Sequence, residues 1–511
     1  MTKAAIGIRK NLILWHRWLG VVFSLFFLMW FVSGIVLMYW PYPAVSPELR
    51  VEKSPAIDAD SVRVGLREAM TLAKAEKAER VRITMLDGRP VYRFHEGRLQ
   101  TLAYADRPER FRGVDQESAL RIAAAWTGLP AREAIFDGAL KDEDQWTLNK
   151  VVRPLRPFLR FHWKDGQEVY VSQVTGEVMQ HTTRAARLGA YFGAIPHWLY
   201  FTPIRKDTSS WRALVIALSL VGTVMTVFGI VVGIWLYSPS KRFRFASGPS
   251  SIPYAGWKRW HTILGLVFGL VTFTWILSGM FSMNPWSWSP EFGPDPKVMA
   301  ALRGGEWNAE AFGSEQPGEF LRRVGRPVKE LELTIAMGKG SYVLRDGLET
   351  LSAALGGAPM REVPMGAVQE RVVAAMGGAP LKEARVVRDF ENYYVSRDKN
   401  LPLPAYYFEF ADAEGTMHYV DSATGQVVRS FVTLSRWNRW LYHGLHSLDL
   451  PWLYKTRPTW DILVILLMLG GLALSGTSVW IAAIRVRRKA REKSAAKASV
   501  GGGALAGASG D

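Results

Sequence analysis

The chain has 511 residues, of which 49% are hydrophobic, and it carries a formal net charge of +17. It contains 21 Trp and no Cys. The lack of Cys excludes disulfides, thiolate-ligated iron–sulfur clusters, Cys-based zinc sites and c-type haem attachment, so any metal chemistry must use His, Met or carboxylate ligands.

Four segments lack Asp, Glu, Lys and Arg and are long enough to cross about 30 Å of hydrocarbon as helices. They cover residues 19–40, 213–238, 260–283 and 462–484. The first follows basic residues, as a signal peptide would. Its apolar run is too long for one, and Tyr39-Trp40-Pro41-Tyr42 is a poor cleavage site, so we interpret it as a retained anchor. The sequence predicts four transmembrane helices.

Most of the excess positive charge flanks these helices on one side. It lies in the N-terminus at 1–18, the loop at 239–259 and the tail at 485–511. Clustered Lys and Arg beside membrane spans are typical of cytoplasmic segments. We therefore expect both termini in the cytoplasm and the long segments 41–212 and 284–461 outside it. The charge then no longer supports binding to nucleic acid.

Each outward segment is expected to hold a small α+β domain followed by an interfacial helix. The domains would cover 41–183 and 284–431, and the interfacial helices 184–212 and 432–461. Periodicity and turn residues in the first domain predict helices at 61–78 and 116–127 and strands at 80–85, 91–94, 158–163 and 169–172. In the second domain they predict a helix at 365–376 and strands at 406–411 and 417–420. Residues 494–511 are expected to form a flexible tail.

The two halves of the chain are related by an internal repeat. Shifted onto one another, they align Trp15-His16 with Trp260-His261, Gly20 with Gly265, Trp30 with Trp275, Ser33-Gly34 with Ser278-Gly279, Thr175-Gly176 with Thr424-Gly425, and His197 with His446. Both copies enter the membrane from the same side. The fold expected is therefore two parallel repeats about a pseudo-twofold axis along the membrane normal.

Two strand–turn–strand pieces share the pattern Tyr-Val-x-x-x-Thr-Gly-x-Val, at Tyr170 to Val178 and Tyr419 to Val427. They resemble PepSY domains, and their insertion between paired spans resembles the PepSY-associated transmembrane family over about residues 8–488. The sharper motifs are the Trp-His starts of two spans and Gly444-Leu445-His446. That family includes inner-membrane haem proteins that reduce ferric siderophores in the periplasm. The resemblance thus implies a bacterial inner-membrane protein with periplasmic soluble domains.

Five histidines fall into two groups at opposite membrane faces. His16 and His261 are at the cytoplasmic ends of the first and third spans, whereas His197, His443 and His446 precede the second and fourth spans on the outer side. A six-coordinate haem b needs one imidazole from each side. We expect two haems, one held by His16 with His261 and one by His197 with His446. His443 has no repeat mate and is an alternative outer ligand. Membership of an interfacial aromatic belt is the competing interpretation of these positions.

Other residues fit a haem pair less specifically. Arg17 and Arg259 could pair with haem propionates, although positive-inside topology also explains them. Gly20, Gly265, Gly34 and Gly279 would admit a flat macrocycle, or simply a neighbouring helix. His95, His162, His181 and His418 are expected to be surface or hydrogen-bonded residues.

These features lead to a hypothesis of transmembrane electron transfer. A cytoplasmic donor, either a flavoprotein reductase or reduced flavin, would supply electrons, because the chain shows no nucleotide-binding motif of its own. By resemblance, the acceptor would be a periplasmic ferric siderophore that releases ferrous iron, with no catalytic residues beyond the haem ligands. The alternatives are a haem-free PepSY sensor or binding protein and a metal transporter using His197, His443 and His446. The uncharged spans disfavour the transporter.

Overall fold

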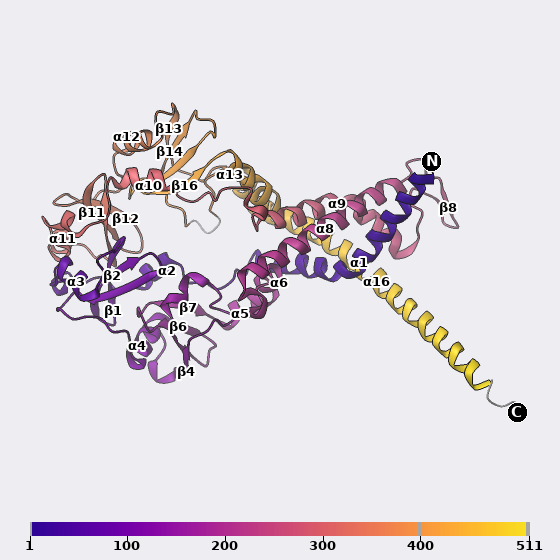
Figure 1. The fold of residues 1–511 in the computed structure, drawn as a ribbon, viewed down its shortest axis with the longest axis horizontal. Coiled ribbons are helices and arrows are strands. Elements are labelled where there is room, and N and C mark those ends of the chain that lie inside the picture. Colours follow the sequence, from indigo (N-terminus) through magenta and orange to yellow (C-terminus); the bar gives the residue numbers. More distant parts are fainter. Residues whose placement is uncertain (1–2, 397–399, 507–511) are drawn as a thin grey trace. The chain divides into compact units, whose positions relative to one another are not determined.

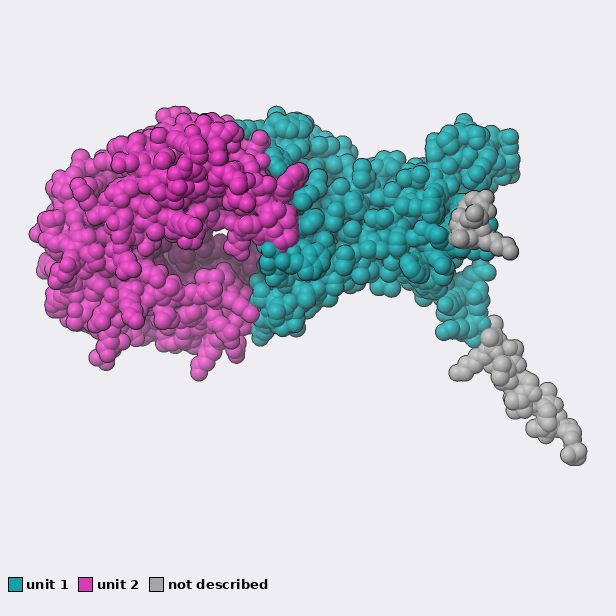
Figure 2. Space-filling view, turned by 45° about the horizontal axis from the view of Figure 1, so that its top comes forward, with its two compact units in different colours: residues 1–41, 189–287, 440–511 teal, residues 42–188, 288–439 magenta. Residues whose placement is uncertain are grey.

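The structure is a computed structural model that describes residues 3–396 and 400–506. It divides into two compact units, and each unit is assembled from distant parts of the chain (Figure 2). Unit 1 comprises residues 1–41, 189–287 and 440–511 and contains the long helices. Unit 2 comprises residues 42–188 and 288–439 and contains the large sheets.

Four long helices form the body of unit 1 (Figure 1). They are α1 (Lys3–Leu37), α8 (Thr208–Leu236), α9 (Gly256–Phe281) and α16 (Thr459–Ala506). Each contains a stretch long and apolar enough to cross a membrane, which confirms the four predicted spans. The tail prediction was wrong for residues 494–506, because α16 continues to Ala506; residues 507–511 lie outside the described part of the chain.

The four helices pack as a closed bundle. Both α1 and α9 pack against α8 and α16, so α1 and α9 lie diagonally opposite one another. Glycines allow the close approaches: a Cβ at Gly470 would collide with Phe268, and one at Gly471 with Phe31. Small residues at helix contacts let backbones pack closely where lipid provides no hydrophobic drive.

Short helices connect the long helices to unit 2. In the first half they are α5 (Arg184–Phe192), α6 (Ala194–Trp198) and α7 (Thr202–Arg205). In the second half they are α13 (Thr433–Asn438), a π-helical turn at Arg439–Gly444, α14 (Leu445–Ser447) and α15 (Pro451–Tyr454). Several short helices thus stand in each half where the sequence predicts one interfacial helix. A hairpin of β8 (Phe243–Phe245) and β9 (Gly248–Ser250) links α8 to α9.

The largest sheet in unit 2 contains strands from both halves of the chain. Its order is β12-β11-β10-β1-β2-β3. The strands are β1 (Arg80–Leu86), β2 (Arg89–Glu96), β3 (Leu99–Tyr104), β10 (Glu330–Ala336), β11 (Lys339–Arg345) and β12 (Thr350–Ala354). The halves meet where β1 pairs antiparallel with β10. The expectation of a separate domain in each half is therefore corrected here, because one core of buried side chains serves both sets of strands.

Two four-stranded sheets complete unit 2. One has the order β4-β5-β6-β7 and the other β13-β14-β15-β16. Their strands are β4 (Ile135–Leu140), β5 (Phe158–His162), β6 (Glu168–Ser172), β7 (Val178–Thr182), β13 (Leu381–Val387), β14 (Ala405–Phe410), β15 (Met417–Asp421) and β16 (Val427–Phe431). Gly176 and Gly425 both have φ of +68°, which explains the two Thr-Gly turns. The repeat itself stays a prediction.

The helices of unit 2 are shorter. They are α2 (Pro47–Lys53), α3 (Leu66–Ala73), α4 (Gln116–Thr127), α10 (Pro296–Arg303), α11 (Pro317–Val324) and α12 (Met365–Ala375), with short 3-10 segments at Ala59–Ser61, Ala131–Glu133, Lys150–Leu155 and Ala309–Phe312. The structure confirms the predicted helices at 116–127 and 365–376. The one predicted at 61–78 was largely wrong: only α3 forms, preceded by extended chain that buries Val62 and Val64 and ended by Lys74 at φ +55°.

Candidate functional site

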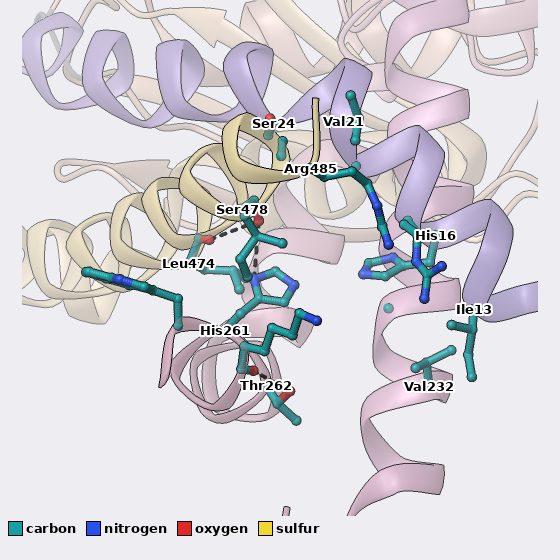
Figure 3. A pocket seen from close by; sticks show the side chains of 18 of the residues that line it. Ile13, His16, Val21, Ser24, Val232, His261, Thr262, Leu474, Ser478 and Arg485 are labelled. Carbon is teal, nitrogen blue, oxygen red and sulfur yellow. Dashed lines mark hydrogen bonds between the residues drawn. The ribbon is translucent and has the colours of Figure 1, made fainter. Parts of the chain in front are cut away.

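Two pairs of histidine rings lie close together in unit 1. The ring centroids of His16 on α1 and His261 on α9 are 6.2 Å apart, with the planes inclined by 30° (Figure 3). The centroids of His197 on α6 and His446 on α14 are 6.1 Å apart, with an angle of 57°. Two metal–nitrogen bonds of about 2 Å, extended to the ring centres, would separate the centroids of a bis-imidazole pair by about 6 Å. Both pairs have the spacing that axial ligation requires.

The His197 ring is held by α1. Its Nδ1 lies 3.3 Å from the Trp30 carbonyl oxygen and 3.2 Å from Ser33 Oγ. Ser33 donates its own proton to the Trp30 carbonyl, so its oxygen is left to accept from the ring. A carbonyl can only accept, which places the imidazole proton on Nδ1 and leaves the Nε2 lone pair available. Burial lowers the pKa of His197 to about 3, with His446 adding to the effect, so the ring is neutral.

The His446 ring is held by α9 in the same way. Its Nδ1 lies 3.2 Å from the Trp275 carbonyl oxygen and 3.1 Å from Ser278 Oγ, and Ser278 donates to that carbonyl. The sequence repeat already pairs these residues with Trp30 and Ser33, but their role as histidine anchors was not predicted. Only the recurrence of Trp-x-x-Ser-Gly could have indicated it.

A glycine lies beside each outer ring. A Cβ at Gly34 would lie 3.3 Å from Cε1 of His197, and one at Gly279 would lie 3.5 Å from Cε1 of His446. Each glycine directly follows the serine that anchors the same ring. The space at Gly34 is taken by the His197 ring and by Met468, whose Cε would lie 3.0 Å from a Cβ there, whereas a Cβ at Gly279 would make ordinary van der Waals contact with the His446 ring.

The inner pair is anchored by α8 and α16. His16 Nδ1 lies 3.1 Å from the Met225 carbonyl oxygen. His261 Nδ1 lies 3.2 Å from the hydroxyl oxygens of both Thr477 and Ser478, and both hydroxyls donate to the Leu474 carbonyl. Those oxygens therefore accept from the ring, so both inner histidines also carry their proton on Nδ1.

The inner rings line a cavity of about 1030 Å³ (Figure 3). Gly20 and Gly265 line it too, one helical turn beyond His16 and His261 on the same helix faces. A Cβ at Gly20 would meet no atom within 4 Å, and one at Gly265 would meet only Leu474, at 3.8 Å. Helix packing therefore does not account for these two glycines. The space beside them, in a cavity at the upper end of the usual range for small-molecule sites, would accommodate a flat macrocycle.

Basic side chains surround the mouth of this cavity. Arg17 lines it, as do Lys258, Arg485, Arg488 and Lys489, and Arg485 points inward beside the two rings (Figure 3). Arg259 is not among the lining residues; it donates to Ser250 Oγ at 2.6 Å. The three basic residues from α16 were interpreted from sequence only as a topology signal, since nothing local indicated that they would face His16.

The two histidine pairs are far apart along the bundle. The rise from His16 to Ser33 on α1 is about 25 Å at 1.5 Å per residue, so no inner ring can share an iron with an outer one. Buried aromatic side chains pack between the pairs, including Phe27, Phe31 and Trp275, and the last two have ring centroids 5.9 Å apart. Aromatic side chains therefore occupy much of the bundle between the pairs, and the inner cavity extends as far as Phe27 and Thr272.

The remaining histidines occupy different surroundings. The His443 ring lies beside Tyr442, with ring centroids 4.3 Å apart and planes inclined by 45°, whereas His446 is the ring opposite His197. The four sheet histidines all make hydrogen bonds, as expected. Their partners are Arg82 for His95, Asp137 for His162, Gln167 for His181 and Ser430 for His418.

Comparison with known proteins adds one match. The model of the PepSY-associated TM region matches residues 13–318, a stretch that includes most of α1, all of α8 and α9, and the strands between them. No curated protein matches the chain. Because the matched stretch covers more than half of the sequence, the chain belongs to the PepSY-associated transmembrane family.

Proposed function

We propose that the protein is a di-haem b reductase of the bacterial inner membrane. It would pass electrons from a cytoplasmic donor to a periplasmic ferric chelate of the siderophore class, releasing ferrous iron. The observation that carries the proposal is the pair of bis-histidine arrangements, with centroids 6.2 and 6.1 Å apart. In all four rings, Nδ1 is committed to an anchor and Nε2 is left for a metal.

The two haems would be held at opposite ends of the bundle. His16 and His261 would ligate one, and His197 and His446 the other. Haem b supplies an iron that accepts and releases one electron at a time. The chain's own residues would orient the ligands through Nδ1, exclude water with the buried aromatic side chains, and neutralise propionates with Arg17 and Arg485.

The direction of transfer follows from the distribution of charge. The basic cavity mouth and the basic connector between α8 and α9 belong to the end of the bundle that we assign to the cytoplasm. A donor would therefore meet the His16–His261 pair first. His197 and His446 lie at the other end, where a periplasmic acceptor would arrive.

The transporter alternative receives no support from the site. Within the described residues, no three His, Asp or Glu side chains gather in a way that could hold a metal ion. A transporter using His197, His443 and His446 would need such a group. A haem-free sensor, in turn, would not need the open space beside Gly20 and Gly265.

Haem stoichiometry tests the proposal directly. The purified wild type should bind two haems per chain, measured as the pyridine haemochrome against protein concentration. His261→Ala and His446→Ala should each retain one, because each removes a ligand from a different pair. His162→Ala, which changes a sheet histidine bonded to Asp137, is the matched control and should retain two. A colourless but folded wild type would refute the proposal, and full haem content in His261→Ala would refute the inner pair.

A further inference from the structure

A second cavity lies entirely within unit 2. Its volume is about 330 Å³, and it is enclosed by α2, the β1–β2 hairpin, α4 and the turn before β7. Five cationic side chains line it, from Arg50, Lys53, Arg82, Arg93 and Arg121. It is remote from the basic segments that flank the spans, so membrane topology does not explain its charge.

The cavity also contains three carboxylates, but these already form ion pairs with two of the cationic side chains. Asp87 pairs with Arg121 at 2.7 Å. Arg82 binds Glu330 at 2.7 Å and lies 3.4 Å from Glu177. Arg82 and Arg121 are thereby neutralised. For the other three cations, Arg50, Lys53 and Arg93, Glu177 is the one carboxylate in the cavity that could compensate their charge, and it also serves Arg82.

Arg93 is the most constrained of these cations. Its side chain forms the buried floor of the cavity, with only 2% of the residue exposed. Its Nε donates to Thr84 and one Nη to the Thr175 carbonyl, while the carboxylate of Glu177 is 3.9 Å away. Burial, together with repulsion from Arg82 and Arg50, lowers the pKa of Arg93 to about 10, so the guanidinium remains charged at neutral pH. Because Arg93 shares the Glu177 carboxylate with Arg82 and Arg50, the cations here outnumber the charge that compensates them, and a further anion would be favourable.

Two further cations converge from α2. Among the described residues, the guanidinium of Arg50 has no hydrogen-bond or ion-pair partner, although its charge acts on both Glu177 and Arg93. Lys53 donates to the Trp126 carbonyl at 3.1 Å, a neutral partner. Both side chains are therefore available to a ligand without first giving up a carboxylate.

We propose that this cavity binds a small organic polycarboxylate. Its carboxylates would be held by Arg50, Lys53 and Arg93, since guanidinium groups match carboxylates with paired, charge-assisted hydrogen bonds. The walls also include the apolar side chains of Val51 and Ile122, which suit a carbon skeleton better than a fully hydrated inorganic anion. The volume is at the lower end of the range for small-molecule sites. This site is independent of haem.

Isothermal titration of the full-length protein in detergent tests the site, with citrate as the probe. The wild type should bind one citrate per chain, and phosphate at least about tenfold more weakly. Arg50→Ala should weaken citrate binding about tenfold, through loss of a charge-assisted pair. Arg132→Ala, which removes an arginine that does not line the cavity, should change it less than about twofold.

Each other outcome overturns the inference. Citrate that produces no heat and is not retained in equilibrium dialysis would show that the cavity is not an anion site. Equal affinity for phosphate and citrate would show that the cavity does not select an organic polycarboxylate over an inorganic anion. Equal losses in Arg50→Ala and Arg132→Ala would place the ligand elsewhere. Arg50 is only half-buried, so its variant should fold, which circular dichroism can verify.

Discussion

His197 and His446 approach each other from opposite sides of the bundle, and each is anchored on a helix that carries an inner histidine. Ser33 holds His197 on α1, the helix of His16, and Ser278 holds His446 on α9, the helix of His261. Each of these two helices therefore carries one inner histidine and positions one outer histidine. A shift of either helix would disturb both sites together.

The serine anchors can be tested separately from the ligands. Ser33→Ala leaves His197 with the Trp30 carbonyl as its one remaining Nδ1 partner, so we expect the ring to be less fixed and the outer haem to be retained about tenfold less tightly. Redox titration should show a changed potential for that haem alone. Ser219→Ala, another buried serine of the bundle, is the control. If both haems or neither changed, Ser33 would not be a positioning residue.

His443 and His446 can be distinguished by a pair of variants. His446→Ala should lose the outer haem, because it removes the ring opposite His197. His443→Ala should retain both haems, because its ring lies beside Tyr442 and it is His446 that faces His197. Absorbance spectra of the two purified variants measure this. Haem loss in His443→Ala alone would reverse the assignment.

The space beside Gly20 offers a test of cavity occupancy. Gly20→Leu should fold normally, since a Cβ there meets nothing within 4 Å, yet it should lose the inner haem because the side chain would occupy the macrocycle's place. Gly7→Leu, at another uncrowded position of α1 that does not line the cavity, should retain it. Haem content and thermal unfolding are measured together. Normal haem content with raised stability in Gly20→Leu would mean that the mutation merely fills an empty hole.

The basic cavity mouth predicts a preference for anionic donors. Replacing Arg488 and Lys489 with Ala should slow haem reduction by reduced flavin mononucleotide about tenfold, while haem reduction by reduced riboflavin, which lacks the phosphate, should change little. Arg491 and Lys493 do not line the cavity, so replacing that pair with Ala is the matched control. The effect of the double replacement on reduction by flavin mononucleotide should shrink in about 1 M salt, because the Debye length there is about 3 Å and the surface charges are screened. Equal effects of the two double variants would show that the general positive charge of the surface, and not the cavity mouth, attracts the donor.

The β1–β10 seam predicts acid sensitivity of unit 2. Glu332 on β10 binds Arg80 at 2.6 Å and Arg345 at 2.8 Å, and although burial opposes it, these partners lower the pKa of Glu332 to about 2. A lowered carboxyl pKa stabilises the fold fully above the unfolded value, near 4.3, and the stabilisation disappears as pH falls toward 2. The melting temperature of the wild type should drop across that window.

A pair of glutamine variants isolates the contribution of the seam. Glu332→Gln should cost about 3 kcal/mol at neutral pH, because it removes a buried carboxylate and leaves the largely buried Arg345 with Glu330 alone. Glu310→Gln breaks the exposed pair with Arg67 and should cost under about 1 kcal/mol. Thermal unfolding followed by circular dichroism gives both values. Similar costs for the two variants would show that the seam is not held by its charges.

Much of the local structure could be predicted from sequence. The spans follow from apolar length, and helix α4 and strands β5 and β6 follow from periodicity with clear turn residues. The pairing of β1 with β10 could not be predicted in this way, because periodicity identifies a strand without naming its neighbour. The helix predicted at 61–78 failed because residues 62 and 64 bury their side chains from extended chain.

The candidate site was predicted unevenly for a related reason. His16, His261, His197 and His446 were found because the repeat matched them, and the structure brings each pair together. Their anchors were missed at Met225, Thr477 and Ser478, where the contact joins different helices and no local pattern marks it. Arg485 was also missed, since one basic residue in a basic tail gives no sign of which way it points.

The mixed sheet has a consequence for how the chain is made. After β1 leaves the ribosome, α8 and α9 must both be synthesised before β10 appears, a delay of tens of seconds at about 5–20 residues per second. During that time β1 lacks its neighbour on one side, and its edge is open to wrong partners. The nascent first half therefore has to be protected from aggregation until the second half has been synthesised. If the two halves were expressed as separate polypeptides, each should aggregate unless both were produced together.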